Sequence, residues 1–324
     1  MKLLLVAVLA AAAAPAGPVP VIYDTDMGND IDDAIALAVL HALESRGEAR
    51  LLAVTITKDN PWAAAYVDLV NTFYGRGHVP VGVVAQGVTP EDSPYIRVPA
   101  EQSRADGTPV YPRRLRDGRE APEAVALLRR VLSEQADGSV VIVQVGFSTN
   151  LARLLASDRD LIARKVRLLS VMAGQFPTGD PEYNVKTDLP AARKLFTEWP
   201  APIVASGFEV GQAIRYPAAS IERDYAYVAR HPIAEAYRLY MKMPYDRQAW
   251  DPTAALYAVR PGRGYFSLSP AGRITVDETG RTRFETVPRG PHRYLIVNEI
   301  EKARTLEALV ELASQPPAAA GALH

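Results

Sequence analysis

Near its start the chain crowds five aspartates into ten residues. They are Asp24, Asp26, Asp30, Asp32 and Asp33. Carboxylates this close together repel one another strongly unless a cation or several hydrogen-bond donors neutralise them. The segment contains no cysteine or histidine, and oxygen-only ligands suit a hard cation such as Ca²⁺ or Mg²⁺. The spacing therefore predicts a metal site built from these carboxylates.

A plainer interpretation covers only part of this cluster. Asp32 and Asp33 run directly into an apolar helical pattern, and acidic residues stabilise a helix N-terminus. That does not explain Asp24 and Asp26, which fall at the end of a short apolar strand. The segment is not an EF-hand loop, because the twelfth residue from Asp24 is Ile35, where that loop needs a bidentate glutamate.

A strand that ends in Asp-x-Asp also fits phosphatases that form an aspartyl-phosphate. In that alternative Asp24 is the nucleophile and Mg²⁺ is the metal. Such enzymes usually carry a hydroxyl residue two positions after the second aspartate, and here that position is Gly28. The phosphohydrolase is therefore the weaker alternative.

The elements that must position these residues alternate between strand and helix patterns. Uniformly apolar strands separated by helices predict an α/β fold, an open, mostly parallel, Rossmann-like sheet with helices on both faces. Ligands in such sheets bind beyond the carboxyl ends of the strands. The expected strands are residues 19–23, 51–57, 81–84, 140–145, 166–172 and 203–205, and the expected helices are residues 33–43, 62–74, 121–135, 150–156, 190–198 and 300–314.

Two regions break this alternation. Residues 86–120 form a polar segment with Pro and Gly, which we expect to cover a site or a neighbouring subunit. Residues 267–297 read as a small C-terminal β-meander with a turn at 278–280.

Composition excludes several classes of function. The 324 residues include 36 Lys and Arg against 37 Asp and Glu, a formal net charge of −1, which gives no electrostatic basis for binding nucleic acid or an anionic membrane surface. The chain has no cysteine, so disulfides, thiol nucleophiles and cysteine metal sites are excluded.

The first residues are typical of a secretory signal peptide. Lys2 is followed by an apolar run that is too short to span a bilayer, and Ala14-Pro15-Ala16 resembles a cleavage site. We therefore expect residues 1–16 to be a signal peptide and residues 17–324 to be a single catalytic domain. The mature protein would be secreted or periplasmic and would not be held in a membrane.

The acidic run resembles the hallmark of the nucleoside hydrolases, the inosine–uridine preferring N-ribohydrolase family. That hallmark is a strand, an Asp-x-Asp-x-Gly run and an Asp-Asp-Ala helix start. The resemblance implies that Asp26 is a metal ligand and the base that deprotonates a metal-bound water, that Asp33 is a bidentate ligand, and that Asp32 contacts the ribose. Two extra residues precede the Asp-Asp-Ala start, compared with the shortest family form, and they leave Asp30 without an assigned role.

The resemblance continues at four further places in the family's order, over residues 19–259. It implies that the Thr149 carbonyl and Asp251 complete a Ca²⁺ site, and that Asn60, Glu182 and Asn184 bind ribose hydroxyls. Each place also has an ordinary structural interpretation. Asn60 before a proline fits a helix cap, and Asp251 before a proline fits a helix start.

The chain departs from the family where some members carry a histidine that protonates the leaving base. Trp250 stands there instead. A purine-preferring branch of the family is similar at this place and sandwiches the base between aromatic side chains, so Trp62 and Trp250 are candidate stacking residues. Tyr245 and Arg247 are candidate donors to the leaving base.

The resemblance implies a Ca²⁺-dependent hydrolase of the N-glycosidic bond of ribonucleosides, with purine nucleosides favoured, that releases free base and ribose. It also implies a small-molecule nucleoside as substrate and a homo-oligomer, a dimer or tetramer. A non-catalytic nucleoside- or sugar-binding protein on the same scaffold remains the alternative, with Trp250 marking a lost acid.

Overall fold

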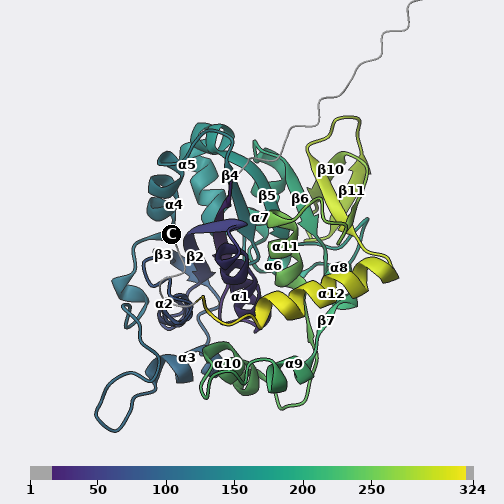
Figure 1. Cartoon of the computed structure of the whole chain (residues 1–324). Helices are drawn as coiled ribbons and strands as arrows, with labels where there is room; N and C mark the ends of the chain where they lie inside the picture. Colours follow the sequence, from purple (N-terminus) through teal and green to yellow (C-terminus); the bar gives the residue numbers. More distant parts are fainter. Residues whose placement is uncertain (1–16, 319–324) are drawn as a thin grey trace, which may run out of the picture.

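A computed structural model describes residues 17–318 (Figure 1). The predicted signal peptide, residues 1–16, lies outside the described residues. Within the described part of the chain, none of the helices combines the length and the apolar character that crossing a bilayer requires.

A single large sheet runs through the structure, as the strand patterns predict. Its seven mutually parallel strands lie in the order β3-β2-β1-β4-β5-β6-β12, and β10 and β11 continue the sheet beyond β12 as an antiparallel pair. These strands are β1 (Val19–Thr25), β2 (Ala49–Lys58), β3 (Val81–Val88), β4 (Val140–Gln144), β5 (Val166–Met172), β6 (Ile203–Ser206), β10 (Gly272–Val276), β11 (Thr282–Thr286) and β12 (His292–Ile296).

The structure also has three short strands. β9 (Ser267–Leu268) pairs with β12, and β7 (Arg215–Tyr216) and β8 (Arg247–Gln248) form a separate two-stranded pair. The meander of residues 267–297 is present, and its β10–β11 turn falls at 278–280 as predicted. Because β12 lies parallel to β6, the meander extends the main sheet.

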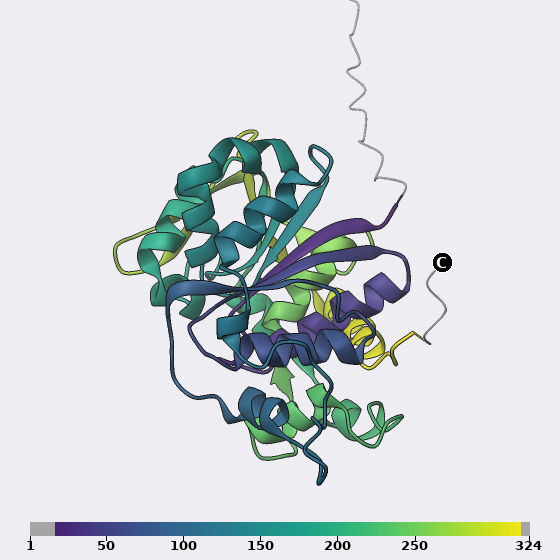
Figure 2. The same ribbon diagram turned by 90° about the vertical axis from the view of Figure 1, so that its left-hand side faces the viewer.

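Helices cover both faces of the sheet, since its strands are apolar on both sides. Val21 and Tyr23 of β1 enter one core, while Ile22 between them enters the other. Figure 2 shows the two helical layers on either side of the strands. The first core holds α1 (Asp32–Ser45), α2 (Ala63–Phe73), α11 (Trp250–Val259) and α12 (Glu299–Ala313), and the second holds α4 (Ala124–Ser133), α5 (Thr149–Lys165) and α7 (Leu189–Glu198).

The remaining helices are short. They are α3 (Pro94–Glu101), η1 (Gly118–Glu120), α6 (Tyr183–Thr187), α8 (Phe208–Ala213), α9 (Ala218–Arg223) and α10 (Pro232–Tyr240). α3 packs against α10 and α2, at the lower edge of Figure 1.

The order of the strands locates a crevice. β1 lies between β2 and β4, and the helices that follow β1 and β4 cover opposite faces of the sheet. At such a switch point the two chain connections diverge and leave space beyond the carboxyl ends of the strands. The acidic run follows β1 directly and therefore enters this crevice.

Candidate active site

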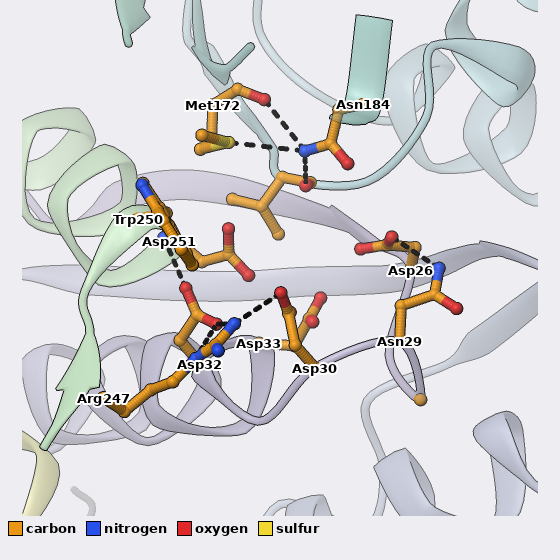
Figure 3. A network of polar contacts seen from close by, with 12 residues as sticks. Asp26, Asn29, Asp30, Asp32, Asp33, Met172, Asn184, Arg247, Trp250 and Asp251 are labelled. Carbon is orange, nitrogen blue, oxygen red and sulfur yellow. Dashed lines mark hydrogen bonds and ion pairs between the residues drawn. The ribbon is translucent and has the colours of Figure 1, made fainter. Parts of the chain in front are cut away.

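A cavity of about 560 Å³ lies beyond the carboxyl ends of the central strands. Seven residues that the sequence singles out line it: Asp26, Asp30, Glu182, Asn184, Arg247, Trp250 and Asp251. The other seven do not line it: Asp24, Asp32, Asp33, Asn60, Trp62, Thr149 and Tyr245. Two of these, Asp32 and Asp33, lie in the first turn of α1 beside the lining residues Asp30 and Asp251 (Figure 3).

The loop from β1 to α1 places Asp26 at the cavity wall. Asp26 is the first residue after β1, and burial raises the pKa of its carboxyl to about 7. Its Oδ2 accepts a hydrogen bond of 2.7 Å from Asn29 Nδ2. Gly28 turns the loop with φ +116°, and a Cβ there would approach Lys58 Cδ to 2.9 Å. The positive φ favours glycine at this turn, and a Cβ would also crowd the side chains of Lys58 and Ile96.

Asp24 holds neighbouring elements together. Its Oδ1 accepts hydrogen bonds from Thr55 Oγ1 at 2.6 Å and from Asn150 Nδ2 at 2.9 Å. The side chain is fully buried, and burial raises its pKa to about 7. Because Asp24 ties β1 to β2 and α5 away from the cavity, it is not placed as a nucleophile, which argues against the phosphohydrolase alternative.

Arg247 is paired with two aspartates of the acidic run. Its Nη2 lies 2.5 Å from Asp30 Oδ2, and its Nε and Nη2 donate to Asp32 Oδ1 at 3.0 and 2.9 Å (Figure 3). Asp32 Oδ2 accepts the backbone N–H of Asp251 at 3.2 Å. Carboxyl oxygens of Asp30, Asp32 and Asp251 lie within 4.8 Å of one another. Two distant segments of the chain thus meet in one charged cluster.

The three predicted carboxylate ligands of the metal lie close enough to affect one another. Burial, and then the negative charges of Asp26, Asp30 and Asp32, raise the pKa of Asp33 well above its ordinary value. Burial and the charge of Asp32, followed by Asp33, do the same to Asp251. Asp33 Oδ1 accepts a hydrogen bond from the Thr25 hydroxyl, while its buried Oδ2 has no partner within residues 17–318. Crowded, oxygen-only carboxylates with an unpartnered oxygen fit a divalent cation.

Thr149, the fourth predicted ligand, is the first residue of α5 at the carboxyl end of β4. Its hydroxyl donates to the Asp188 carboxylate. The more compact carboxylate group in the described residues is Asp30, Asp32 and Asp251, which shares only Asp251 with the set that the family resemblance implies.

Glu182 and Asn184 reach the cavity from the start of α6. Glu182 caps this helix, and its carboxylate accepts the backbone N–H groups of Asn184 at 2.9 Å and Gly174 at 3.0 Å. Asn184 Nδ2 donates to the carbonyls of Val145 at 2.6 Å and Met172 at 3.2 Å (Figure 3). The amide nitrogen is thereby committed, and the carbonyl oxygen of Asn184 is left for another donor.

Asn60 and Trp62 are not where the sequence interpretation puts them. Asn60 Oδ1 accepts the backbone N–H of Trp62 at 2.9 Å, and its Nδ2 donates to the Glu91 carbonyl at 3.0 Å. Asn60 thus forms a turn before α2, while Trp62 is the N-cap residue of that helix, so Asn60 is neither the predicted ribose contact nor the helix cap of its ordinary interpretation. Trp62, at the start of α2, is half-buried against the core and does not line the cavity, which corrects its assignment as a base-stacking residue.

Trp250 does line the cavity, and three aromatic residues that the sequence interpretation missed accompany it there: Tyr183, Phe208 and Tyr240. The rings of Phe208 and Trp250 stack with centroids 5.4 Å apart, and Trp250 Nε1 donates to the Phe208 carbonyl at 2.9 Å. A Cβ on Gly211 would approach Trp250 Cδ1 to 2.2 Å. α8 therefore seats the indole because Gly211 has no side chain. Phe208 follows a strand end, the one sequence feature that could have indicated it.

The two candidate donors to the leaving base separate in the structure. The Tyr245 hydroxyl donates to the Tyr237 carbonyl at 2.6 Å, away from the cavity, which corrects its assignment. The Arg247 guanidinium lies 4.9 Å from the centre of the Trp250 ring. Although burial opposes it, the charges of Asp32 and Asp30 raise the pKa of Arg247, so this group stays charged.

The polar segment of residues 86–120 supports the acidic loop. The Tyr95 hydroxyl on α3 accepts the backbone N–H of Gly28 at 2.9 Å and donates to the Asp30 carbonyl. Tyr95 is buried. Residues 86–120 thus contact the acidic loop, which agrees with the expectation that this segment covers a site.

The sequence profile of a known family, described as inosine-uridine preferring nucleoside hydrolase, matches residues 21–312. The chain belongs to this family. Pyrimidine-specific ribonucleoside hydrolase RihA of Klebsiella pneumoniae subsp. pneumoniae is 32% identical over 214 residues, which are 63% of this chain and 65% of that protein. The RihA of Enterobacter sp. is 32% identical over 211 residues, 63% of this chain and 64% of that protein. The matches thus span just under two thirds of these nucleoside hydrolases.

Solved nucleoside hydrolases share the fold. A plant nucleoside hydrolase, PpNRh1, superposes with a TM-score of 0.70 at 23% identity, covering 92% of this chain and 100% of that one. A nucleoside hydrolase from Bacillus anthracis, described as inosine-uridine preferring, gives a TM-score of 0.71 at 16% identity, covering 91% and 99%. A purine-preferring ribonucleoside hydrolase from Gardnerella vaginalis gives 0.68 at 20%, covering 91% and 98%.

Proposed function

We propose that this chain is a Ca²⁺-dependent ribonucleoside hydrolase that favours purine nucleosides and acts in the periplasm or outside the cell. The observation that carries the proposal is the joining of Asp26, Asp251, Glu182 and Asn184 in one cavity. These residues come from three places in the chain that match the family's motifs in order. A small cavity with convergent carboxylates and amides suits a small polar substrate.

Hydrolysis of an N-ribosidic bond develops positive charge on the sugar, needs a nucleophilic water and expels a base. Asp26 accepts the proton of the water, and a pKa raised by burial favours a carboxylate base near neutral pH. Glu182 and Asn184 are proposed to hold the ribose hydroxyls and thereby fix the sugar for in-line attack. Asp32, predicted to share this role, is buried with both oxygens bonded to Arg247 and to the Asp251 N–H, so it positions Arg247 instead. Surrounding carboxylates stabilise the positive charge on the sugar.

We assign the metal to Asp26, Asp33, Asp251 and the Thr149 carbonyl. When bound, Ca²⁺ supplies a Lewis acid that acidifies water and orients the ribose hydroxyls. Exhaustive chelation is expected to abolish sugar release, and added Ca²⁺ is expected to restore it. The release of reducing sugar from a nucleoside, measured before chelation, after it and after add-back, checks this. Undiminished release after chelation would contradict the metal assignment.

The aromatic wall supports binding of a base. Phe208 is 37% exposed and stacks on Trp250, so the pair offers an apolar surface to a planar ring. Arg247 is fixed beside it, and because it stays charged we propose that it stabilises the departing base by hydrogen bonding and charge. Its Nη1 has no hydrogen-bond partner among residues 17–318.

The large aromatic surface favours purines, while the RihA relatives described as pyrimidine-specific favour the second candidate, pyrimidine nucleosides. Purified chain incubated with inosine, adenosine, guanosine, uridine and cytidine decides between them through the reducing sugar released from each. We expect inosine or another purine nucleoside to give the highest kcat/KM. Binding without sugar release from any of the five would support the non-catalytic alternative.

A substitution at Gly211 tests the aromatic wall. Because a Cβ at this position would lie 2.2 Å from Trp250 Cδ1 and 2.4 Å from Trp250 Cα, Gly211→Ala is expected to displace Trp250 and raise KM for the preferred nucleoside by about 10-fold, a loss of roughly 1.4 kcal/mol of binding. Steady-state kinetics measures this. Gly262→Ala is the matched control, since a Cβ at Gly262 meets nothing within 4 Å. Unchanged KM in Gly211→Ala would show that Trp250 does not contact the base.

A further inference from the structure

A buried lysine lies behind the wall of the cavity. Lys58 is the last residue of β2, and its side chain is only 2% exposed. Its ammonium donates to Asn29 Oδ1 at 2.9 Å and to the Thr89 carbonyl at 2.6 Å, while the exposed Glu91 carboxylate is 3.9 Å away. A charged group costs free energy to bury, so a lysine kept here needs the partners it is given.

These partners fix the orientation of one amide. A side-chain amide has one oxygen that accepts and one nitrogen that donates. Asn29 turns its oxygen toward the Lys58 ammonium, and its nitrogen therefore faces Asp26 Oδ2 at 2.7 Å and Thr89 Oγ1 at 3.3 Å. The reversed amide would place an N–H group against the ammonium. Lys58 thus selects the orientation in which Asn29 donates to Asp26.

The surrounding backbone is shaped for this contact. Thr89, just past the end of β3, has φ +56°, an outlier for a β-branched residue. Its carbonyl and hydroxyl reach Lys58 and Asn29 in this conformation. The lysine stem passes beside Gly28, where any Cβ would meet it. Thr89 contacts the ammonium and Gly28 borders the stem of the lysine, and backbone strain such as that at Thr89 often marks functional sites.

We propose that Lys58 is a positioning residue for Asp26, acting through Asn29. The relay holds Oδ2 of the carboxylate, and Oδ1 is left without a hydrogen-bond partner among residues 17–318, free to serve the cavity. The consequence for catalysis rests on the proposed function, because it assumes that Asp26 is the base. The relay itself is a geometric claim that does not depend on it.

Lys58→Met removes the ammonium and keeps most of the stem. It is expected to lower kcat for the preferred nucleoside about 10- to 100-fold, with KM changed less than about threefold, because a misplaced base slows the reaction without losing the substrate's contacts. In an Asn29→Ala background, Lys58→Met is expected to lower kcat by less than about threefold, since its effect passes through Asn29. Lys194→Met on α7 is the matched control at an exposed ion pair and is expected to leave kcat unchanged.

Two kinetic results would overturn the proposal: unchanged kcat in Lys58→Met, or an equal fall of kcat in both backgrounds. Thermal unfolding of each variant confirms that the folded enzyme is compared. Crystal structures of the wild type and Lys58→Met add a readout without turnover, in which the Asn29–Asp26 hydrogen bond is expected to be lost. Its retention would overturn the proposal. A wild type that hydrolyses no nucleoside but loses this bond in Lys58→Met would refute the proposed function and leave the relay standing.

Discussion

Asp26→Asn is expected to lower kcat for nucleoside hydrolysis by about 10³-fold, within the usual range for losing a general base. The amide has nearly the shape of the carboxylate but does not accept the proton of water. In the wild type, Asn29 Nδ2 donates to Asp26 Oδ2 at 2.7 Å, and the new amide would face this same N–H group. With Ca²⁺ in saturating excess we expect KM to change less than kcat, because Glu182, Asn184 and the other assigned metal ligands still hold the substrate.

Steady-state kinetics on matched preparations measures this effect. Asp160→Asn is the control, because Asp160 is an exposed residue of α5 far along the chain from the acidic run. Near wild-type kcat in Asp26→Asn would remove Asp26 as the base and require another carboxylate of the cavity in its place.

The second large effect is expected at Arg247. Arg247→Ala leaves Asp32 buried without its counter-charge, and breaking a buried pair from one side costs about 3 kcal/mol of stability, at the lower end because Asp30 is one third exposed. The same change removes the guanidinium that lies against the Trp250 ring and is proposed to stabilise the departing base. We therefore expect kcat to fall as well. Arg247→Lys keeps the charge but loses the planar fork and should recover only part of the loss.

Denaturant unfolding of the apo protein gives the stability change directly. The double variant Asp30→Asn with Arg247→Ala should lose less than Arg247→Ala alone, because one of the uncompensated charges is gone. Arg159→Ala on the exposed face of α5 is the control. An Arg247→Ala protein as stable as the wild type would show that the cluster is neutralised by other means.

Much of this architecture follows from local pattern. The strand at residues 140–145 is apolar and β-branched, and it becomes β4; the acidic run after the first strand enters the crevice because parallel strands end at one edge. Residues 207–240 escaped prediction for an equally local reason. α8 and α9 have six residues each, too few to show a helical period, and tertiary packing determines them.

In the site, too, local sequence predicts some features and tertiary packing determines the others. Several carboxylates close together in the sequence predict a metal site. The ion pair between Arg247 and Asp32 joins residues 215 positions apart, so local spacing does not predict it. The residues around Asn60 fit both a ribose contact and a turn, and in the structure Asn60 forms the turn. Aromatic residues such as Phe208 and Tyr240 reach the cavity only through the fold.

The most direct test is the anomalous difference map of crystals soaked in Ca²⁺, recorded at long wavelength. We predict one peak per chain, bounded by the carboxylates of Asp26, Asp33 and Asp251 and by the Thr149 carbonyl. A peak centred instead among Asp30, Asp32 and Asp251 with Arg247 displaced, or no peak at all, would contradict this assignment.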